Sequence, residues 1–285
     1  MVDYQIIRDM EIAQELLGWT DEELAGELGV TRATLNRWRI EKRVPIGKID
    51  LFYSQAFQNR IRLNRIKEQF YREDYTDDSH RILFHGAKSC IDGRLSLEKS
   101  RKNNDFGQGF YCGESLEQSA MFVANYKEAS LYMVRFCKEG LRKKVFGVNR
   151  DWMLLIAHCR GRLSEFADSP LVEKLLRSIK DIDYIVAPIA DNRMFEIIDS
   201  FIEGEITDVQ CQHCLSATNL GSQYVFLTEA ALEQVHILER CYLAQEEKES
   251  YLQSHREYSE VNRDKVKIAR RQYRGQGKYI EEILK

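Results

Sequence analysis

Apolar residues recur every three or four positions through the first part of the chain, the spacing of amphipathic helices. Thr20 and Glu23 have the spacing of a capping box, and Thr31 is a candidate N-cap for a later helix. Gly18 and Gly29 end two of the apolar segments. The pattern predicts a small all-α domain over residues 1–45, with helices at residues 10–17, 21–28 and about 32–43.

The same periodicity continues from Ile46 to about Arg72, where only Asn59 interrupts the apolar stripe. We expect one packing helix over this stretch, followed by an acidic and polar linker over residues 71–80. Residues 46–80 would thus connect two domains.

From residue 81 onward, short apolar runs alternate with helical patterns, as expected for an α+β domain. An apolar run over residues 81–85 predicts a strand that ends at Gly86. A turn with Gly107 and Gly109 leads into an extended run from Phe110, and a helix follows from Ser115. Further elements are a buried strand within residues 181–191 and helices over residues 151–162, 168–180 and 194–202.

Beyond about residue 238 the chain becomes strongly charged, and basic residues dominate its last part. A charge run of this kind usually marks the solvated face of a helix, so residues 238–285 are predicted to form a charged helical tail. A surface that binds nucleic acid or another partner is the alternative. Gly275 and Gly277 predict that the end of this tail is loose.

Three side chains of the α+β region have the character of ligand-binding groups. His85 stands at the exit of the first strand, where both ring nitrogens can meet ligand hydroxyls. Tyr111 follows the glycine turn and would stand beside the same pocket, and Ser119 lies in the first turns of the next helix. Each residue alone is as consistent with ordinary packing, but their order and spacing together favour a binding site.

The stretches that contain these residues resemble the DUF3990 family of the ADP-ribosyltransferase superfamily, in its histidine-tyrosine-glutamate class. The similarity covers about residues 81–237. It implies a split antiparallel β-sheet core with helices, which holds NAD as the ADP-ribose donor. The matching residues are Phe84 to Gly86, Arg101, Asp105 to Tyr111, Tyr184 to Asn192, and Gln223 to Phe226.

The resemblance also implies roles for individual residues. His85 would bind the adenine-side ribose, and the backbone of Gly86 would hold the nicotinamide amide. Tyr111 would stack on the nicotinamide ring, and Ser119 would contact its carboxamide. Arg101, Asp105 and Gly109 complete the implied NAD-binding set.

Gln223 stands where the superfamily carries a catalytic glutamate, although glutamine is expected within DUF3990 itself. Breaking the nicotinamide–ribose bond builds positive charge on the sugar, which a carboxylate stabilises better than a neutral amide. We therefore expect mono-ADP-ribosyl transfer, or slow NAD hydrolysis, in place of polymer synthesis. A gain in nicotinamide release by a Gln223→Glu variant would show that the amide limits the reaction.

The N-terminal helices resemble the helix-turn-helix of phage-repressor-like proteins. That resemblance implies a DNA-reading third helix with Arg32, Asn36 and Arg37 on its exposed side. An interaction module with solvated arginines is the alternative. The whole chain is then expected to be a toxin-like mono-ADP-ribosyltransferase of a toxin–antitoxin or phage-defence system, with NAD, DNA and an antitoxin protein as partners. The alternative is a non-enzymatic regulator that senses NAD and binds DNA, and no residue selects the acceptor.

Composition narrows these expectations. The formal net charge is −3, so binding to nucleic acid would have to come from local basic patches. Seven scattered cysteines and the lack of a signal-like N-terminus predict a reducing, cytoplasmic location. No apolar stretch approaches a membrane span. Cys211 and Cys214 flank His213 but lack a second ligand cluster, so no metal site is expected; the thiols are expected to pack near a strand.

Overall fold

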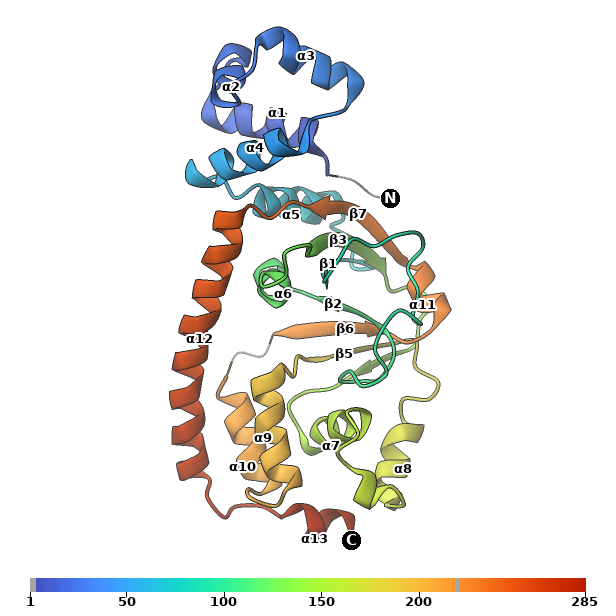
Figure 1. Cartoon of the computed structure of the whole chain (residues 1–285). Coiled ribbons are helices and arrows are strands. Elements are labelled where there is room, and N and C mark those ends of the chain that lie inside the picture. Colours follow the sequence, from blue (N-terminus) through green and yellow to red (C-terminus); the bar gives the residue numbers. More distant parts are fainter. Residues whose placement is uncertain (1–3, 219–220) are drawn as a thin grey trace. The chain divides into compact units, whose positions relative to one another are not determined.

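A computed structural model describes residues 4–218 and 221–285 of the chain (Figure 1). The chain divides into two compact units, each built from discontinuous segments. The first unit comprises Met1–Gly93, Leu116–Phe136 and His236–Gln253. The second unit comprises Arg94–Ser115, Cys137–Val235 and Ser254–Lys285. Helices and strands occur in both, so the predicted mixed class is confirmed.

The first unit begins with five helices, α1 (Ile6–Leu17), α2 (Asp21–Glu27), α3 (Arg32–Glu41), α4 (Ile46–Gln58) and α5 (Leu63–Asp74). The predicted ends of the first three follow from their caps. Gly18 takes the left-handed conformation that closes α1, at φ 65°. Thr20 and Glu23 form the reciprocal capping box of α2, and the Thr31 hydroxyl accepts from the Thr34 amide at the start of α3.

The single helix predicted over residues 46–72 is wrong, because the chain breaks between α4 and α5. Arg60 adopts a left-handed φ of 65°, which ends α4 just after Asn59. The turn is stabilised by Ile61, which is buried, and by Arg62, whose guanidinium lies 3.7 Å above the Phe57 ring. The helix α5 then continues to Asp74, which shortens the predicted linker.

Three strands of the first unit lie in the order β1 (His80–Ala87), β3 (Ser130–Cys137) and β7 (Val235–Cys241), of which β3 and β7 each extend one residue beyond the unit. The helix α6 (Leu116–Val123) packs on β1, and Phe84 of β1, Ala120 of α6 and Met133 of β3 belong to one buried cluster. This packing places the end of β1 beside Ser119 and Val123 of α6.

The first unit also buries a charged side chain. Lys67 on α5 has no exposed surface, and its ammonium lies 2.8 Å from Asp9 Oδ2 on α1 and 2.5 Å from Glu239 Oε1 on β7. The hydroxyls of Tyr53 and Tyr71 donate to the same two carboxylates. These contacts tie α1, α4 and α5 to β7 through one polar cluster.

Four strands of the second unit lie in the order β4 (Lys143–Val145), β5 (Tyr184–Pro188), β6 (Ser222–Phe226) and β2 (Phe110–Gly113). The pairs β5–β6 and β6–β2 are antiparallel, but β4 and β5 run parallel. The predicted antiparallel core is therefore corrected at this edge. A parallel pair needs a crossover, and residues 146–183, which contain α7 and α8, supply it.

Helices α7 (Arg150–Cys159), α8 (Pro170–Arg177), α9 (Asn192–Ile202) and α10 (Asp208–Ser216) gather on one side of β5 and β6 in Figure 1. Short elements η1 (Ser164–Phe166) and α11 (Glu229–Glu233) complete the region. Trp152, Ile198 and Val225 are fully buried members of the core beneath these helices. The sequence located α7, α8 and α9 to within a few residues, because each has a strong apolar period.

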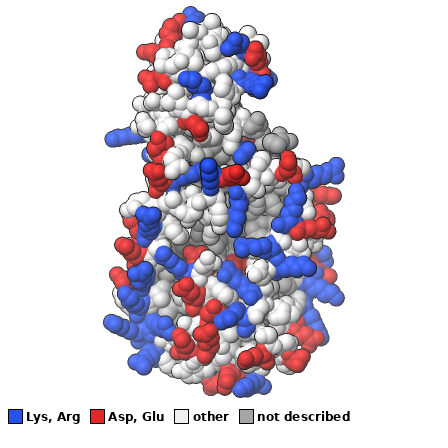
Figure 2. All heavy atoms as spheres, viewed as in Figure 1, with Lys and Arg blue, Asp and Glu red and all other residues white. Residues whose placement is uncertain are grey.

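The charged tail is a helix, α12 (Gln245–Gln272), followed by α13 (Ile280–Leu284). Its end is not loose, as the two glycines predicted. Ile280 and Leu284 are buried in the core of the second unit, and the Lys278 amide donates to Asp208 over 2.8 Å. Gly275 and Gly277, at φ 72° and 92°, instead form the turn that lets α13 pack back. Lys and Arg side chains gather over the later part of α12 (Figure 2).

Candidate functional site

Three of the predicted NAD-binding residues lie in the first unit, at the contact between β1 and α6. Gly86 lies so close to α6 that a Cβ there would come within 2.8 Å of Val123 Cγ1 and 3.0 Å of the Ser119 carbonyl oxygen. The Ser119 hydroxyl is buried and donates to the Phe84 carbonyl over 3.4 Å. The ring of His85 lies 6.5 Å from that of Tyr132. The structure therefore brings His85, Gly86 and Ser119 together, and Gly86 permits the close approach.

The glycine turn lies in the second unit and needs its two glycines for different reasons. Gly107 has a φ of 76°, a conformation that other residues rarely adopt. Gly109 has an ordinary φ, but a Cβ there would lie 2.8 Å from the Phe226 carbonyl oxygen and 3.1 Å from Val225 Cγ1. The turn can therefore press its backbone against β6 only with glycine at position 109.

Tyr111 is tied to the same turn by its hydroxyl. The hydroxyl donates to the Gly107 carbonyl over 2.7 Å and accepts from the Phe106 amide over 3.1 Å. Burial raises the pKa of this hydroxyl well above its usual range, and the charge of Asp105 adds to the rise. Tyr111 is thus a neutral phenol over the physiological pH range, and its ring is held in place by the loop that precedes it.

Tyr111 and Gln223 lie on the same face of neighbouring antiparallel strands. Tyr111 on β2 is opposite Val225 on β6, and Gly113 is opposite Gln223. Directly opposed residues share a face, and so do residues two apart on one strand, so all four point to one side of the sheet. Gly113 has no side chain to cover Gln223. The arrangement leaves an aromatic ring and a primary amide as diagonal neighbours.

Asp105 holds the Gln223 amide from behind. Gln223 Nε2 donates to Asp105 Oδ2 over 2.8 Å and to the Pro188 carbonyl over 3.0 Å. Asp105 Oδ2 also accepts from the Ala190 amide over 3.2 Å, and Arg160 donates to Oδ1 through Nε and Nη2. The Asp105 carboxylate, predicted to contact the cofactor, is thus buried and bonded to four protein donors.

Arg160 is the member of this network that the sequence analysis missed. Its Nη2 also donates to the Ala190 carbonyl over 2.5 Å, and its guanidinium lies 4.2 Å from the centre of the Phe195 ring. Arg160 neutralises Asp105, so the cluster around Gln223 carries no net charge. The sequence signal was an arginine at the end of an apolar helix, which has many simpler explanations.

Arg101 stands apart from these contacts. Its side chain is exposed, in the long connection between β1 and β2, and its backbone carbonyl accepts from the Asn104 side chain over 3.0 Å. Its predicted role toward NAD remains a prediction.

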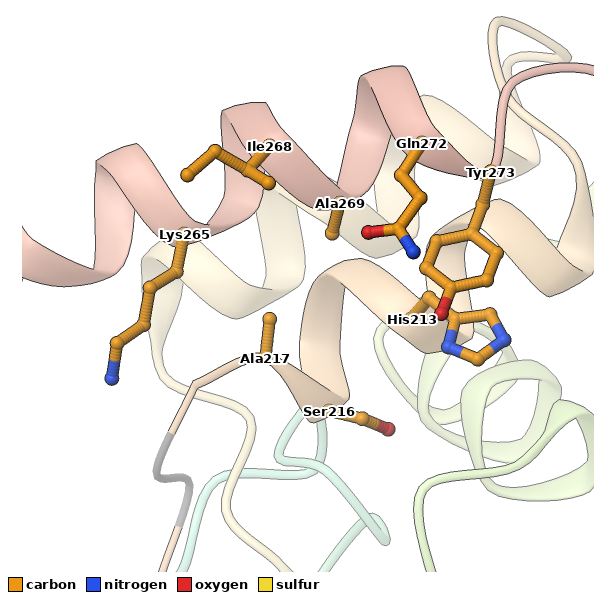
Figure 3. A pocket seen from close by; sticks show the side chains of 8 residues that line it. All are labelled: His213, Ser216, Ala217, Lys265, Ile268, Ala269, Gln272 and Tyr273. Atoms are coloured by element: carbon orange, nitrogen blue, oxygen red, sulfur yellow. The ribbon is translucent and has the colours of Figure 1, made fainter.

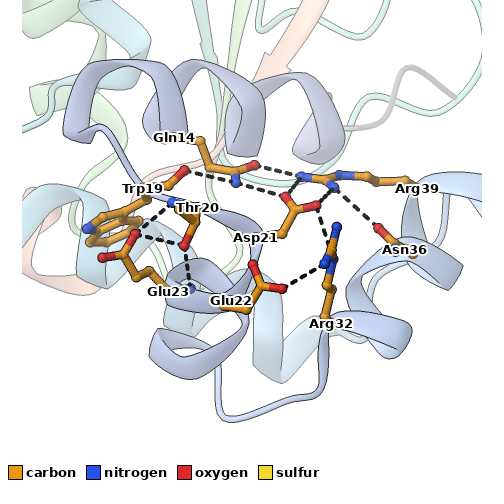
Figure 4. A network of polar contacts seen from close by, with 9 residues as sticks. All are labelled: Gln14, Trp19, Thr20, Asp21, Glu22, Glu23, Arg32, Asn36 and Arg39. Atoms are coloured by element: carbon orange, nitrogen blue, oxygen red, sulfur yellow. Dashed lines mark hydrogen bonds and ion pairs between the residues drawn. The ribbon is translucent and has the colours of Figure 1, made fainter.

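The predicted DNA-reading residues are exposed on α3, but part of its basic charge is paired (Figure 4). Arg32 donates to Glu22 over 2.8 Å, and Arg39 forms an ion pair of the same length with Asp21. Asn36 accepts from Arg39 over 3.4 Å. Residues 20–43 contain five acidic and five basic residues, and Figure 2 shows both charges over this region. Arg37 is the predicted contact with the best access to a phosphate.

A groove on the second unit lies between α10 and the end of α12 (Figure 3). Its volume is about 350 Å³. The rings of His213 and Tyr273 stack at 3.5 Å in its wall. None of the residues predicted to bind NAD lines it; the lining residues are His213, Ser216, Ala217, Lys265, Ile268, Ala269, Gln272 and Tyr273.

Cys211 and Cys214 lie on α10 and both are buried. Cys211 belongs to the core that also contains Ile185 and Ala187 of β5. Burial raises the pKa of each thiol, so both stay protonated at neutral pH. Among the described residues, no group of three or more histidine, cysteine or acidic side chains is arranged to hold a metal ion. In residues 4–218 and 221–285, no helix has both the length and the apolar character to cross a membrane.

Comparison with known proteins found one family match. A family model described as "Protein of unknown function (DUF3990)" matches residues 81–237, which include the glycine turn, Asp105, Arg160 and Gln223. No curated protein and no solved structure matches the chain. Because the family model covers more than half of the 285 residues, the chain belongs to the DUF3990 family.

Proposed function

We propose that this protein is an NAD-dependent mono-ADP-ribosyltransferase. The observation that carries the proposal is the arrangement of Tyr111 and Gln223 on one face of adjacent strands. A tyrosine ring whose hydroxyl is tethered can stack on a flat nicotinamide, and an amide beside it can meet a ribose hydroxyl. The resemblance to ADP-ribosyltransferases assigns these same roles to the two positions.

The neutral cluster around Gln223 sets the expected chemistry. Arg160 balances Asp105, and Gln223 adds no charge, so an oxocarbenium-like transition state would meet an amide dipole in place of a carboxylate. Transfer of one ADP-ribose unit, with weak NAD hydrolysis as a side reaction, is the outcome this supports. His85, Gly86 and Ser119 are the further groups that the resemblance assigns to NAD.

The transfer step can be tested with NAD that is labelled in its adenylate part. The full chain is incubated with labelled NAD and a bacterial lysate, and the products are treated with protease or nuclease. Labelled macromolecules that disappear with one of the two enzymes would support transfer and identify the class of acceptor. A Tyr111→Ala variant is the control and should give no label. Equal labelling by this variant would contradict the proposed role of Tyr111.

A second proposal concerns the helices of residues 1–45, which we propose bind DNA through the exposed face of α3. Asn36 and Arg37 lie exposed on that face, which supports contact with a DNA groove. Arg37→Ala should weaken binding to a mixed duplex library and reduce its dependence on salt. Glu41→Ala, on the same helix, is the control and should not weaken it. If the protein binds DNA and NAD but releases no nicotinamide, it is a non-enzymatic regulator.

A further inference from the structure

We propose that Asp105, whose charge Arg160 neutralises, is the positioning residue that holds the Gln223 side chain with its carbonyl oxygen pointing away from Asp105. The same contact makes position 223 accept glutamine and not glutamate. The inference deepens the proposed NAD-dependent function and rests on it only for the role of the outward oxygen. The residues from which it is argued all lie in the second unit.

The orientation of the Gln223 amide follows from its two partners. A carboxylate oxygen and a peptide carbonyl oxygen can only accept hydrogen bonds. Gln223 contacts one of each, Asp105 Oδ2 at 2.8 Å and the Pro188 carbonyl at 3.0 Å. The nitrogen must therefore face both, and the amide has no hydrogen left to donate. Only its oxygen remains to meet a substrate, and that oxygen selects a hydroxyl or another donor.

Asp105 also acts on the electronic character of that oxygen. A hydrogen bond from an amide N–H to an ionised carboxylate is stronger than one to a neutral acceptor, and hydrogen bonds in a chain polarise one another. The charge behind Nε2 therefore raises the negative partial charge on the Gln223 oxygen. Asp105 thus supplies, through the amide, part of the electrostatic effect that a carboxylate at position 223 would supply directly.

The same contacts explain why glutamate does not fit. An ionised glutamate at position 223 would place its oxygen against Asp105 Oδ2 and the Pro188 carbonyl, where three acceptors would meet without a hydrogen. Arg160 can balance only one of the two carboxylates, and its guanidinium is already bonded to Asp105 and Ala190. Two buried carboxylates in contact hold one proton between them, so the site would resist ionisation of the introduced carboxyl group.

The test compares the thermal stability of Gln223→Glu with that of the wild type at pH 5 and pH 8. At pH 5 the introduced carboxyl group can be protonated and donate to Asp105, whereas at pH 8 the second charge is forced. The melting temperature should fall by about 6 °C or more at pH 8, and by clearly less at pH 5. The charge of Asp105 also acts on Tyr111 and Cys159. Burial raises the pKa of both side chains, so neither ionises between pH 5 and pH 8.

Two further variants complete the test. Asp105→Asn combined with Gln223→Glu leaves a single carboxylate for Arg160 to balance, and should recover part of the loss at pH 8. Gln212→Glu is the matched control, because the Gln212 amide on α10 donates to the Val148 carbonyl over 2.8 Å, and its effect should not depend on pH in this way. The proposal is overturned if Gln223→Glu matches the wild type at both pH values, or if the double variant is no more stable than Gln223→Glu.

Nicotinamide release by the double variant separates this inference from the proposed function. An ionised carboxylate at position 223, beside an amide at position 105, should release nicotinamide at least about tenfold faster than the wild type at pH 8, since it meets the transition state with a full charge. If neither protein releases nicotinamide or binds NAD, the proposed function fails. The stability results would then still decide whether Asp105 positions Gln223.

Discussion

Replacement of Lys67 by methionine tests the buried cluster of the first unit. The side chains of Lys67, Asp9 and Glu239 have no exposed surface, and the ammonium lies 2.8 and 2.5 Å from the two carboxylates. Lys67→Met keeps most of the volume of the side chain but leaves two carboxylates buried without a counter-charge. Removal of one partner from a buried ion pair costs about 3–5 kcal/mol, so we expect a loss of at least about 3 kcal/mol.

Urea unfolding followed by circular dichroism measures this loss. Arg65→Met is the matched control, since Arg65 lies on the same helix and pairs with Glu117, but its side chain is 59% exposed. That ion pair should contribute less than about 1 kcal/mol. A loss of less than about 1 kcal/mol for Lys67→Met, or equal losses for the two variants, would show that the buried cluster does not depend on the Lys67 charge.

The charge on Lys67 should be constant with pH over the physiological range. Burial alone lowers the pKa of Lys67, but Asp9 and Glu239 more than offset it, so the net pKa lies above its usual 10.5. A raised folded-state pKa means that the stabilisation is complete below 10.5 and is lost only as the pH rises through the folded value. The Lys67 ammonium should therefore contribute equally to the wild-type stability at pH 7 and pH 9, and a loss in Lys67→Met that grows from pH 7 to pH 9 would reflect the two unpaired carboxylates.

Burial raises the pKa of Glu247 to about 6, so its ionisation costs stability that is lost between pH 4.5 and about 6 and stays lost above. Glu247→Gln should therefore gain about 2 kcal/mol in urea unfolding at pH 8 and nothing at pH 4. Hydrogen bonds from Arg39 and Gln14 lower the pKa of Asp21 to about 2, so the stability that the Asp21 carboxylate contributes is lost as the pH falls from 3.8 toward 2. Asp21→Asn should therefore make the free energy of unfolding depend less on pH between 3.8 and 2. Gly109→Ala should cost about 1–3 kcal/mol through overpacking, whereas Gly26→Ala, with open space in α2, should gain about 0.5–1 kcal/mol in the same assay.

Local signals in the sequence predicted the helices best. Each helix cap depends only on residues a few positions apart in the chain, so the sequence can predict it. The structure confirms the left-handed Gly18, the capping box of Thr20 and Glu23, and the capping Thr31. The break after α4 was missed because the left-handed conformation at Arg60 has no sequence signature, and arginine does not favour it. The parallel pairing of β4 and β5 was also missed. The direction of pairing depends on the chain that connects two strands, and the residues of the strands themselves do not indicate it.

The polar network behind Gln223 could not be predicted, because its members are far apart in the chain. Asp105 and Gln223 are separated by 118 residues, and Asp105 and Arg160 by 55. From the sequence alone, Asp105 is equally consistent with a residue that contacts a ligand and with one that forms a buried ion pair. The same limit applies to the end of the chain, where Gly275 and Gly277 predicted a loose segment. The burial of Ile280 and Leu284 depends on a surface formed by residues over a hundred positions earlier.

Release of nicotinamide from NAD is the decisive measurement for the proposed ADP-ribosyltransferase activity. The purified full chain is incubated with NAD, and nicotinamide is separated by chromatography and quantified over time, beside Tyr111→Ala and a sample without protein. We predict slow release by the wild type, accelerated by an acceptor, and release by Tyr111→Ala that does not exceed the protein-free sample. Release by Tyr111→Ala at the wild-type rate, or none by the wild type with any class of acceptor, would contradict the claim.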